Sequence, residues 1–203
     1  MAARPPAEFD FPISFAGPDG LGDSVFDDVA QHEAPDVGCD EGDDPAVALR
    51  RTLGMFATGV TVITTRSAEQ VHGMTANAFM SVSLEPPLVL ISVDRRTKMC
   101  GMLHEGGRYG VSVLCESQSA LSDRFAGRRG EDLPEPRFDL VSDTPLVDGA
   151  LAHFVARVER SYWGGDHSLF LGRVEYARYS EGRTPLLFHG GRYERLTPSA
   201  PAR

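Results

Sequence analysis

Residues 73–83 read Gly73-Met74-Thr75-Ala76-Asn77-Ala78-Phe79-Met80-Ser81-Val82-Ser83, with small and polar side chains where a fully buried strand would be apolar. Apolar runs flank this stretch at 60–65 and, after a turn at 84–87, at 88–93. Its polar side chains are separated by even numbers of positions: Thr75, Asn77, Ser81 and Ser83. Because strand side chains alternate between two faces, we predict one strand at 74–83 with these four on a shared face. That face suits a flat ligand with polar edges; the alternative is a solvated face of cross-strand Thr and Ser pairs.

The rest of the chain is predicted to be mostly β-structure. Further strands are expected at 60–65, 88–94, 109–114, 150–163, 168–179 and 185–193, and helices at 45–59, 97–104 and 118–127. The two longest strands are joined by Gly164-Gly165-Asp166, a sequence typical of a hairpin turn. Long antiparallel hairpins with few short helices indicate an all-β-dominated barrel rather than a doubly wound sheet.

Composition indicates a single globular domain. The chain has 203 residues, of which 41% are hydrophobic and 24% charged, as in soluble globular proteins. Twelve of the 29 acidic residues and one of the 20 basic residues lie in 1–44, so the remainder carries a net charge of +2. A nearly neutral body suits phosphate-bearing ligands but lacks the basic stripe that nucleic-acid binding needs.

Three segments are predicted from this charge distribution. Residues 1–44 form an acidic arm that is expected to be disordered, 45–196 form the domain, and 197–203 form a short tail. The three cysteines, Cys39, Cys100 and Cys115, are widely spaced and suggest neither a disulfide framework nor a zinc site. We see no secretory signal and no run of about 18 apolar residues, so a cytoplasmic protein without membrane association is expected.

A second candidate binding segment is Ser92-Val93-Asp94-Arg95-Arg96-Thr97-Lys98, where a strand runs into a helix. Amide groups at a helix start favour an anion, and the basic side chains add positive charge. The alternative is an ordinary capped helix with solvated basic residues. No GxGxxG, no GxxxxGK[ST], no nucleophile elbow and no metal-ligand spacing is present in the sequence, so we expect no metal.

The order of these segments over about residues 46–196 resembles the flavin reductase-like family, whose members fold as an FMN-binding split β-barrel. The resemblance implies flavin-binding residues in three segments. They are Gly73, Met74, Thr75, Ala76, Asn77, Ala78 and Ser81 in the first, Val93, Asp94, Arg95, Thr97 and Lys98 in the second, and Phe125 and Ala126 in the third. Ala78 stands where a serine is common in the family. Without the resemblance, the pattern favours Phe125 as a hydrophobic anchor before a glycine that ends a helix.

The resemblance also implies a site for the reductant. His167, in Gly165-Asp166-His167, corresponds to a histidine near the nicotinamide, and we expect it to position NAD(P)H rather than act as an obligatory acid or base. Phe188, His189, Gly190 and Tyr193 correspond to the segment that borders the same pocket. The alternatives are a surface histidine and an ordinary last strand. His72 is expected to shape the flavin segment, whereas His32, His104 and His153 are expected to be structural or exposed.

The function implied is an NAD(P)H:flavin oxidoreductase, the small reductase component of a two-component monooxygenase. It would use NADH or NADPH to reduce FMN or FAD, which then diffuses to a separate flavin-dependent monooxygenase. A homodimer is implied as well. The alternatives are a non-catalytic flavin- or haem-binding module on the same barrel and an oxidase of the pyridoxamine-phosphate type, which needs a more basic phosphate pocket.

Overall fold

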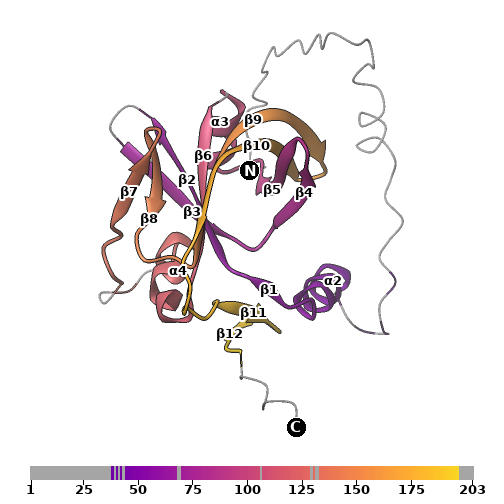
Figure 1. The fold of residues 1–203 in the computed structure, drawn as a ribbon. Coiled ribbons are helices and arrows are strands. Elements are labelled where there is room, and N and C mark those ends of the chain that lie inside the picture. Colours follow the sequence, from indigo (N-terminus) through magenta and orange to yellow (C-terminus); the bar gives the residue numbers. More distant parts are fainter. Residues whose placement is uncertain are drawn as a thin grey trace, which may run out of the picture.

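A computed structural model describes residues 38, 40, 42, 44–67, 70–105, 107–128, 130 and 133–196 (Figure 1). The tail predicted at 197–203 and nearly all of the predicted acidic arm lie outside these residues. Within them the predicted antiparallel, all-β-dominated architecture with a few short helices is confirmed.

The main body is one seven-stranded antiparallel sheet with the strand order β3-β2-β6-β9-β10-β5-β4. These strands are β2 (Thr61–Ser67), β3 (Gln70–Ala76), β4 (Phe79–Leu84), β5 (Pro87–Asp94), β6 (Arg108–Val113), β9 (Ala152–Gly164) and β10 (His167–Tyr179). The turn between β9 and β10 falls at Gly165-Asp166, as predicted, and Gly165 has a φ of +70° that glycine adopts without strain.

Two smaller sheets and three α-helices complete the described chain. One sheet has the order β1-β11-β12, with β1 (Thr58–Gly59), β11 (Leu187–His189) and β12 (Arg192–Glu194). The other is the hairpin of β7 (Phe138–Val141) and β8 (Thr144–Val147). The helices are α2 (Pro45–Gly54), α3 (Lys98–His104), α4 (Ser119–Phe125) and the 3₁₀ turn η2 (Glu116–Gln118).

The core has two parts. Ile63, Ile91, Tyr109 and Phe170 are fully buried in the larger cluster, where α3 contributes Met99 and Leu103. The smaller cluster, built on Val62, Leu114 and Leu186, is covered by four aromatic side chains that belong to α4 and to the small sheets: Phe125, Phe138, Phe188 and Tyr193. Aromatic packing therefore anchors the two small sheets on the barrel.

The prediction of one strand at 74–83 is wrong. The chain leaves β3 at Ala76, turns at Asn77-Ala78 with a hydrogen bond of 3.0 Å from the Phe79 amide to the Asn77 carbonyl, and starts β4 at Phe79. Thr75 lies on β3 whereas Ser81 and Ser83 lie on β4, at the other end of the strand order, so alternation along one strand does not place them on a shared face. Alternation of side chains does not reveal that a short polar link has to carry the chain from one edge to the other.

Three smaller expectations also differ from the structure. The predicted last strand is two strands, since Gly190 and Gly191 take φ values of +58° and +81° and turn the chain into the β11–β12 hairpin. The β7–β8 hairpin was not predicted. Helix α2 ends at Gly54, short of the predicted 59, and β1 follows.

Candidate functional site

The link at Asn77-Ala78 presents unused polar groups at the surface. Asn77 and Ala78 are both exposed, and the Ala78 carbonyl accepts the Ser92 amide of β5 at 3.2 Å. Among the described residues, neither the Asn77 carboxamide nor the Ala78 amide has a hydrogen-bond partner. Because Ser81 on β4 is also exposed, the link and the start of β4 offer donors and acceptors to a ligand.

Helix α4 packs against β3, the strand that precedes this link. The Phe125 ring lies over Gly73 so closely that a Cβ atom at residue 73 would be 2.6 Å from Cε1 of the ring. The Thr75 hydroxyl donates to the Ser122 carbonyl at 2.6 Å. Gly73 is therefore needed for this approach, and the predicted residues Gly73, Thr75 and Phe125 are brought together.

In the loop between β5 and α3, some of the predicted anion-binding residues already bind groups of the loop itself, and others have no acidic partner among the residues that the structure describes. Arg96 binds Asp94 through two contacts, of 2.6 Å from Nη2 and 3.1 Å from Nε, and holds the pKa of that carboxyl well below its usual range. The Thr97 hydroxyl donates to the Asp94 carbonyl at 2.7 Å and accepts the Cys100 amide at 3.2 Å, so it caps α3.

Two cations of this loop remain without an acidic partner among the described residues, Arg95 and Lys98. The Arg95 guanidinium stacks 3.9 Å from the centre of the Trp163 ring. Lys98 lies near β3, where burial and then the Lys98 charge lower the pKa of His72. Helix α3 contacts both β3 and β5, so it links this loop to the part of β3 that was predicted to bind flavin.

The β9–β10 hairpin brings His167 to the same loop. His167 is opposite Asp94 in the β10–β5 register. The Arg95 amide donates to the Asp166 carbonyl at 3.0 Å, and its Nη1 lies 3.4 Å from the Gly165 carbonyl. Two segments that are about 70 residues apart in the sequence thus form one surface with a cation, a carboxylate and an imidazole.

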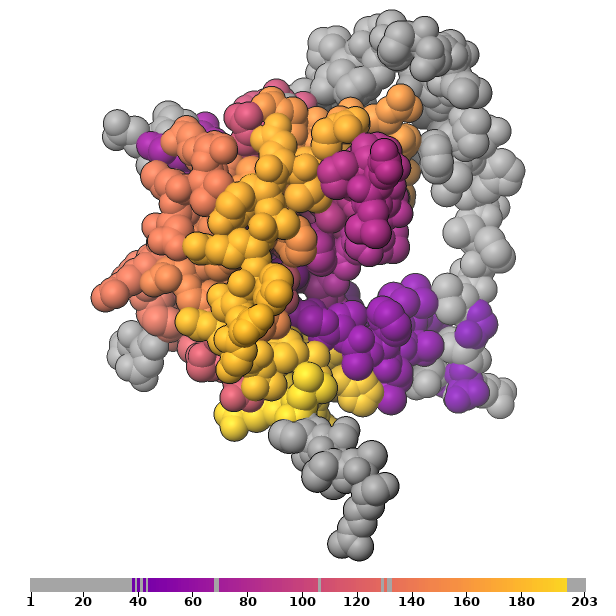
Figure 2. Space-filling view, viewed as in Figure 1, coloured from indigo at the N-terminus to yellow at the C-terminus, as the bar shows by residue number. Residues whose placement is uncertain are grey.

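The C-terminal residues reach the site from the small sheet. Phe188 and Tyr193 have ring centres 5.8 Å apart, and the Tyr193 hydroxyl lies 2.8 Å from Asp123 Oδ1 and 2.9 Å from Ser122 Oγ on α4. Burial raises the pKa of Tyr193. Figure 2 shows the yellow C-terminal segment lying against the rose α4 segment. Tyr193 therefore joins the helix that carries Phe125.

The predicted reductant residues fall into two groups. Phe188, His189, Gly190 and Tyr193 belong to the β11–β12 hairpin, whose Gly190 amide donates to the Gly54 carbonyl at 2.8 Å. His167 belongs to the large sheet, at the start of β10. The described chain thus distributes the predicted reductant site over two separate sheets.

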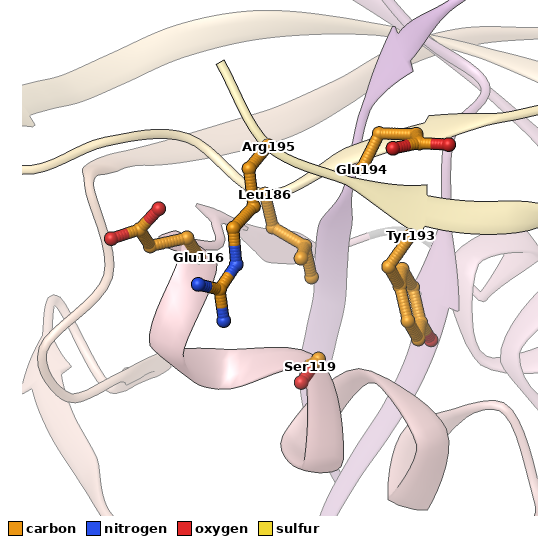
Figure 3. A pocket seen from close by; sticks show the side chains of 6 residues that line it. All are labelled: Glu116, Ser119, Leu186, Tyr193, Glu194 and Arg195. Atoms are coloured by element: carbon orange, nitrogen blue, oxygen red, sulfur yellow. The ribbon is translucent and has the colours of Figure 1, made fainter. Parts of the chain in front are cut away.

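A small pocket of about 200 Å³ lies beside Tyr193 (Figure 3). It is lined by Glu116, Ser119, Leu186, Tyr193, Glu194 and Arg195, and of the predicted residues it contains Tyr193 alone. Pockets for cofactors usually measure about 300 to 1,000 Å³. We therefore place the candidate site on the open surface around β3, β5 and α4 and not in this pocket.

The remaining described histidines support the structure, as expected for His104 and His153. His153 is buried and its Nε2 donates to the Val147 carbonyl at 2.7 Å. The His104 ring lies between Ser168 and Ser161, 3.2 and 3.4 Å from their hydroxyls. The prediction for His32 falls on a residue outside those that the structure describes. In the part of the chain that the structure describes, no group of three or more His, Cys, Asp or Glu could hold a metal ion, and no helix is long and apolar enough to cross a membrane.

Three residues of this arrangement were not predicted from the sequence: Ser122, Asp123 and Trp163. Ser122 has no exposed surface and joins Thr75 to Tyr193. Its position three residues before Phe125 placed it near the same side of a helix, which is the one sequence signal that could have found it. Trp163 precedes the hairpin turn and gave no signal of its stack with Arg95.

Comparisons with known proteins show which family this chain belongs to. The family description "Flavin reductase like domain" matches residues 53–197. An NADH-dependent flavin reductase from Rhodococcus sp is 46% identical over 159 residues, which are 75% of this chain and 89% of that protein. The reductase component of 4-hydroxyphenylacetate 3-monooxygenase from Thermus thermophilus is 42% identical over 149 residues, which are 73% of this chain and 95% of that protein.

Two solved structures are similar to the whole barrel. The flavin reductase PheA2 in its native state is 42% identical with a TM-score of 0.72, and the match covers 77% of this chain and 100% of that one. The Streptomyces globisporus C-1027 NADH:FAD oxidoreductase SgcE6, in complex with NAD and FAD fragments, is also 42% identical with a TM-score of 0.72. That match covers 79% of this chain and 99% of the other.

Proposed function

Since this chain belongs to the flavin reductase-like family and is an NADH-dependent flavin reductase, the reductase component of a two-component monooxygenase, we propose that its β3–α4 surface holds the flavin. The observation that carries this proposal is the approach of Phe125 to Gly73, which aligns the glycine-containing strand and the helix end that the resemblance assigns to flavin. The bound flavin, FMN or FAD, supplies the acceptor for the hydride that NADH delivers.

The chain's own residues fit the three parts of a flavin. The Asn77 carboxamide and Ala78 amide, which have no partner within the described part of the chain, supply hydrogen bonds for the ring edge together with Ser81. Phe125 and the adjacent Ala126 supply an apolar border. Arg95 and Lys98 neutralise the phosphate, because Arg96 and the Thr97 hydroxyl already have partners within the loop.

His167 is assigned to NADH. It lies opposite Asp94 at the end of β5, and Ser92 of the same strand donates its amide to the Ala78 carbonyl at 3.2 Å, so β5 connects His167 with the link that carries Asn77. Holding the two rings in one geometry is the main contribution such a residue can make to hydride transfer. Phe188, His189, Gly190 and Tyr193 border the reductant from the small sheet.

The site is completed by a second copy of the chain. Strand β4 is an edge of the large sheet, and its apolar side chains Met80, Val82 and Leu84 are 54%, 46% and 94% exposed. The β4–β5 hairpin lies at the margin of the described part of the molecule in Figure 2 (magenta). An exposed apolar edge favours association, and a homodimer would also cover the open flavin surface. Light scattering of the flavin-loaded protein tests this: a monomeric mass contradicts it.

The assignment of residues is tested by two variants measured on two quantities. Asn77→Ala is expected to weaken flavin binding, followed by fluorescence quenching, with little change in KM for NADH. His167→Ala is expected to keep flavin affinity and lower kcat/KM for NADH by about ten- to a hundredfold, followed at the nicotinamide absorbance band. If His167→Ala turns over NADH like the parent, the reductant site lies elsewhere.

A further inference from the structure

The tip of the β9–β10 hairpin holds a carboxylate and an imidazole in contact. Nδ1 of His167 lies 2.7 Å from Oδ1 of Asp166. This hydrogen bond, followed by the charge of the imidazole, lowers the pKa of Asp166. An ionised carboxylate only accepts hydrogen bonds, so Nδ1 is the donor and carries the hydrogen.

The backbone beneath this pair is fixed from the neighbouring loop. The Asp166 carbonyl accepts the Arg95 amide at 3.0 Å, and the Arg95 side chain packs on Trp163 at 3.9 Å. Asp94 is opposite His167 in the register, but its carboxylate is engaged by Arg96. Among the charged groups around the imidazole, Asp166 is therefore the one that bonds it directly.

We propose that Asp166 is a positioning residue for His167: it holds the ring in the tautomer with hydrogen on Nδ1 and leaves Nε2 as a hydrogen-bond acceptor for an N–H group of the reductant. The chemical class that fits is a primary carboxamide, as at the end of a nicotinamide, since its NH₂ group donates to such an acceptor. This inference rests on the assignment of His167 to NADH.

The His167 side chain is 41% exposed, so a ligand has access to the ring. An exposed imidazole without a fixed partner changes tautomer and orientation freely. A bond to a neighbouring side chain on a braced turn removes that freedom before the reductant arrives, and a ring held in advance loses less entropy on binding.

The test compares Asp166→Ala with Asp166→Asn. Asn keeps an oxygen that accepts the Nδ1 hydrogen, whereas Ala removes the acceptor. Asp139→Asn is the matched control, because Asp139 is an exposed acid on β7 that pairs with Arg178 at 3.1 Å. Each variant is examined by ¹⁵N NMR of the His167 ring and by separate measurement of kcat and KM for NADH.

In Asp166→Ala we expect the ring to leave the Nδ1–H tautomer and KM for NADH to rise about tenfold, with flavin affinity unchanged. In Asp166→Asn we expect the parental tautomer and a KM within about threefold of the parent. The control is expected to match the parent in both measurements.

Two results would overturn the inference. One is a parental tautomer and KM in Asp166→Ala; the other is an equal loss in both Asp166 variants with the tautomer retained. A failure of the proposed function can be told apart from a failure of this inference. In the first case the parental protein does not reduce flavin with NADH, or the His167→Ala variant turns over NADH at the parental rate. The NMR measurement on the protein alone does not depend on activity, so it judges the Asp166–His167 bond in either case.

Discussion

Substituting Gly73 by alanine tests whether the proposed flavin surface depends on the approach of Phe125 to β3. The added Cβ would lie 2.6 Å from Cε1 and 2.9 Å from Cδ1 of the Phe125 ring. Carbon atoms prefer about 3.5 Å or more, so the ring has to move by about 0.9 Å. Free movement is opposed by the Phe138 ring, whose centre is 6.3 Å away in an edge-on arrangement.

The expected cost follows from this displacement. Adding a carbon to a packed contact costs about 1 to 3 kcal/mol of folding free energy. If the displaced ring borders the flavin, about 1 to 2 kcal/mol is lost in binding as well, and the flavin Kd rises about 5- to 30-fold. Kd is measured by fluorescence quenching, and stability by urea unfolding with the flavin absent.

Gly59→Ala is the control for this experiment. Gly59 also lies in a strand, and a Cβ there would meet no atom within 4 Å. Gly73→Ala has to differ from this control in both measurements. If it is as stable as the control and binds flavin equally well, the Phe125 ring is not held against β3 and the reasoning is refuted. If stability falls but the flavin Kd stays at the control value, Phe125 packs as described but does not border the flavin.

Three further predictions concern single groups. Asn77→Ala should weaken flavin binding by about 1 to 3 kcal/mol, because a bond is lost and its partner is left unpaired; an unchanged Kd would exclude Asn77 from the site. Tyr109→Phe should stabilise the fold by about 1 kcal/mol, raising Tm by about 2 to 4 °C in calorimetry, because the buried Tyr109 hydroxyl has no hydrogen-bond partner among the described residues; a lower Tm would contradict this. Acidification should destabilise the protein, because burial lowers the pKa of His153 from 6.5 and the unfolded chain therefore binds more protons below pH 6.5. For this group the free energy of unfolding falls by at most about 1.4 kcal/mol per pH unit. Equal unfolding free energies at about pH 7.5 and about pH 5.5 would contradict the prediction.

Much of the fold could be predicted because its signals are local. The Gly165-Asp166 turn, the apolar strand at 88–94 and the cap at Thr97 each depend on residues within a few positions of one another. The antiparallel barrel follows from long hairpins joined by such turns. The β7–β8 hairpin was missed because its turn, at Ser142-Asp143, takes positive φ values of 48° and 61° without a glycine to indicate them.

The arrangement of the site could be predicted only in part, for a physical reason. Sequence patterns report which residues share a strand or a helix, but not which edges of a sheet the strands occupy. Thr75 and Ser81 therefore looked like members of one face, although β3 and β4 lie at opposite edges. The stack of Arg95 on Trp163 likewise depends on the β5–β10 and β9–β10 registers, which no local pattern records.

Buried Ser122 explains how the separate parts of the site are held to one another. Its carbonyl accepts the Thr75 hydroxyl of β3, and its hydroxyl meets Tyr193 of β12, so one residue of α4 connects the large sheet with the small one. Phe125, one turn further along α4, lies over Gly73. Because a flavin and its reductant have to be stacked for hydride transfer, the surfaces that bind them need a fixed spacing. A short helix bonded to both sheets fits the proposed site because it fixes that spacing. The Asn77 link is exposed, and neither Arg95, which stacks on Trp163, nor Lys98 has an acidic partner among the described residues.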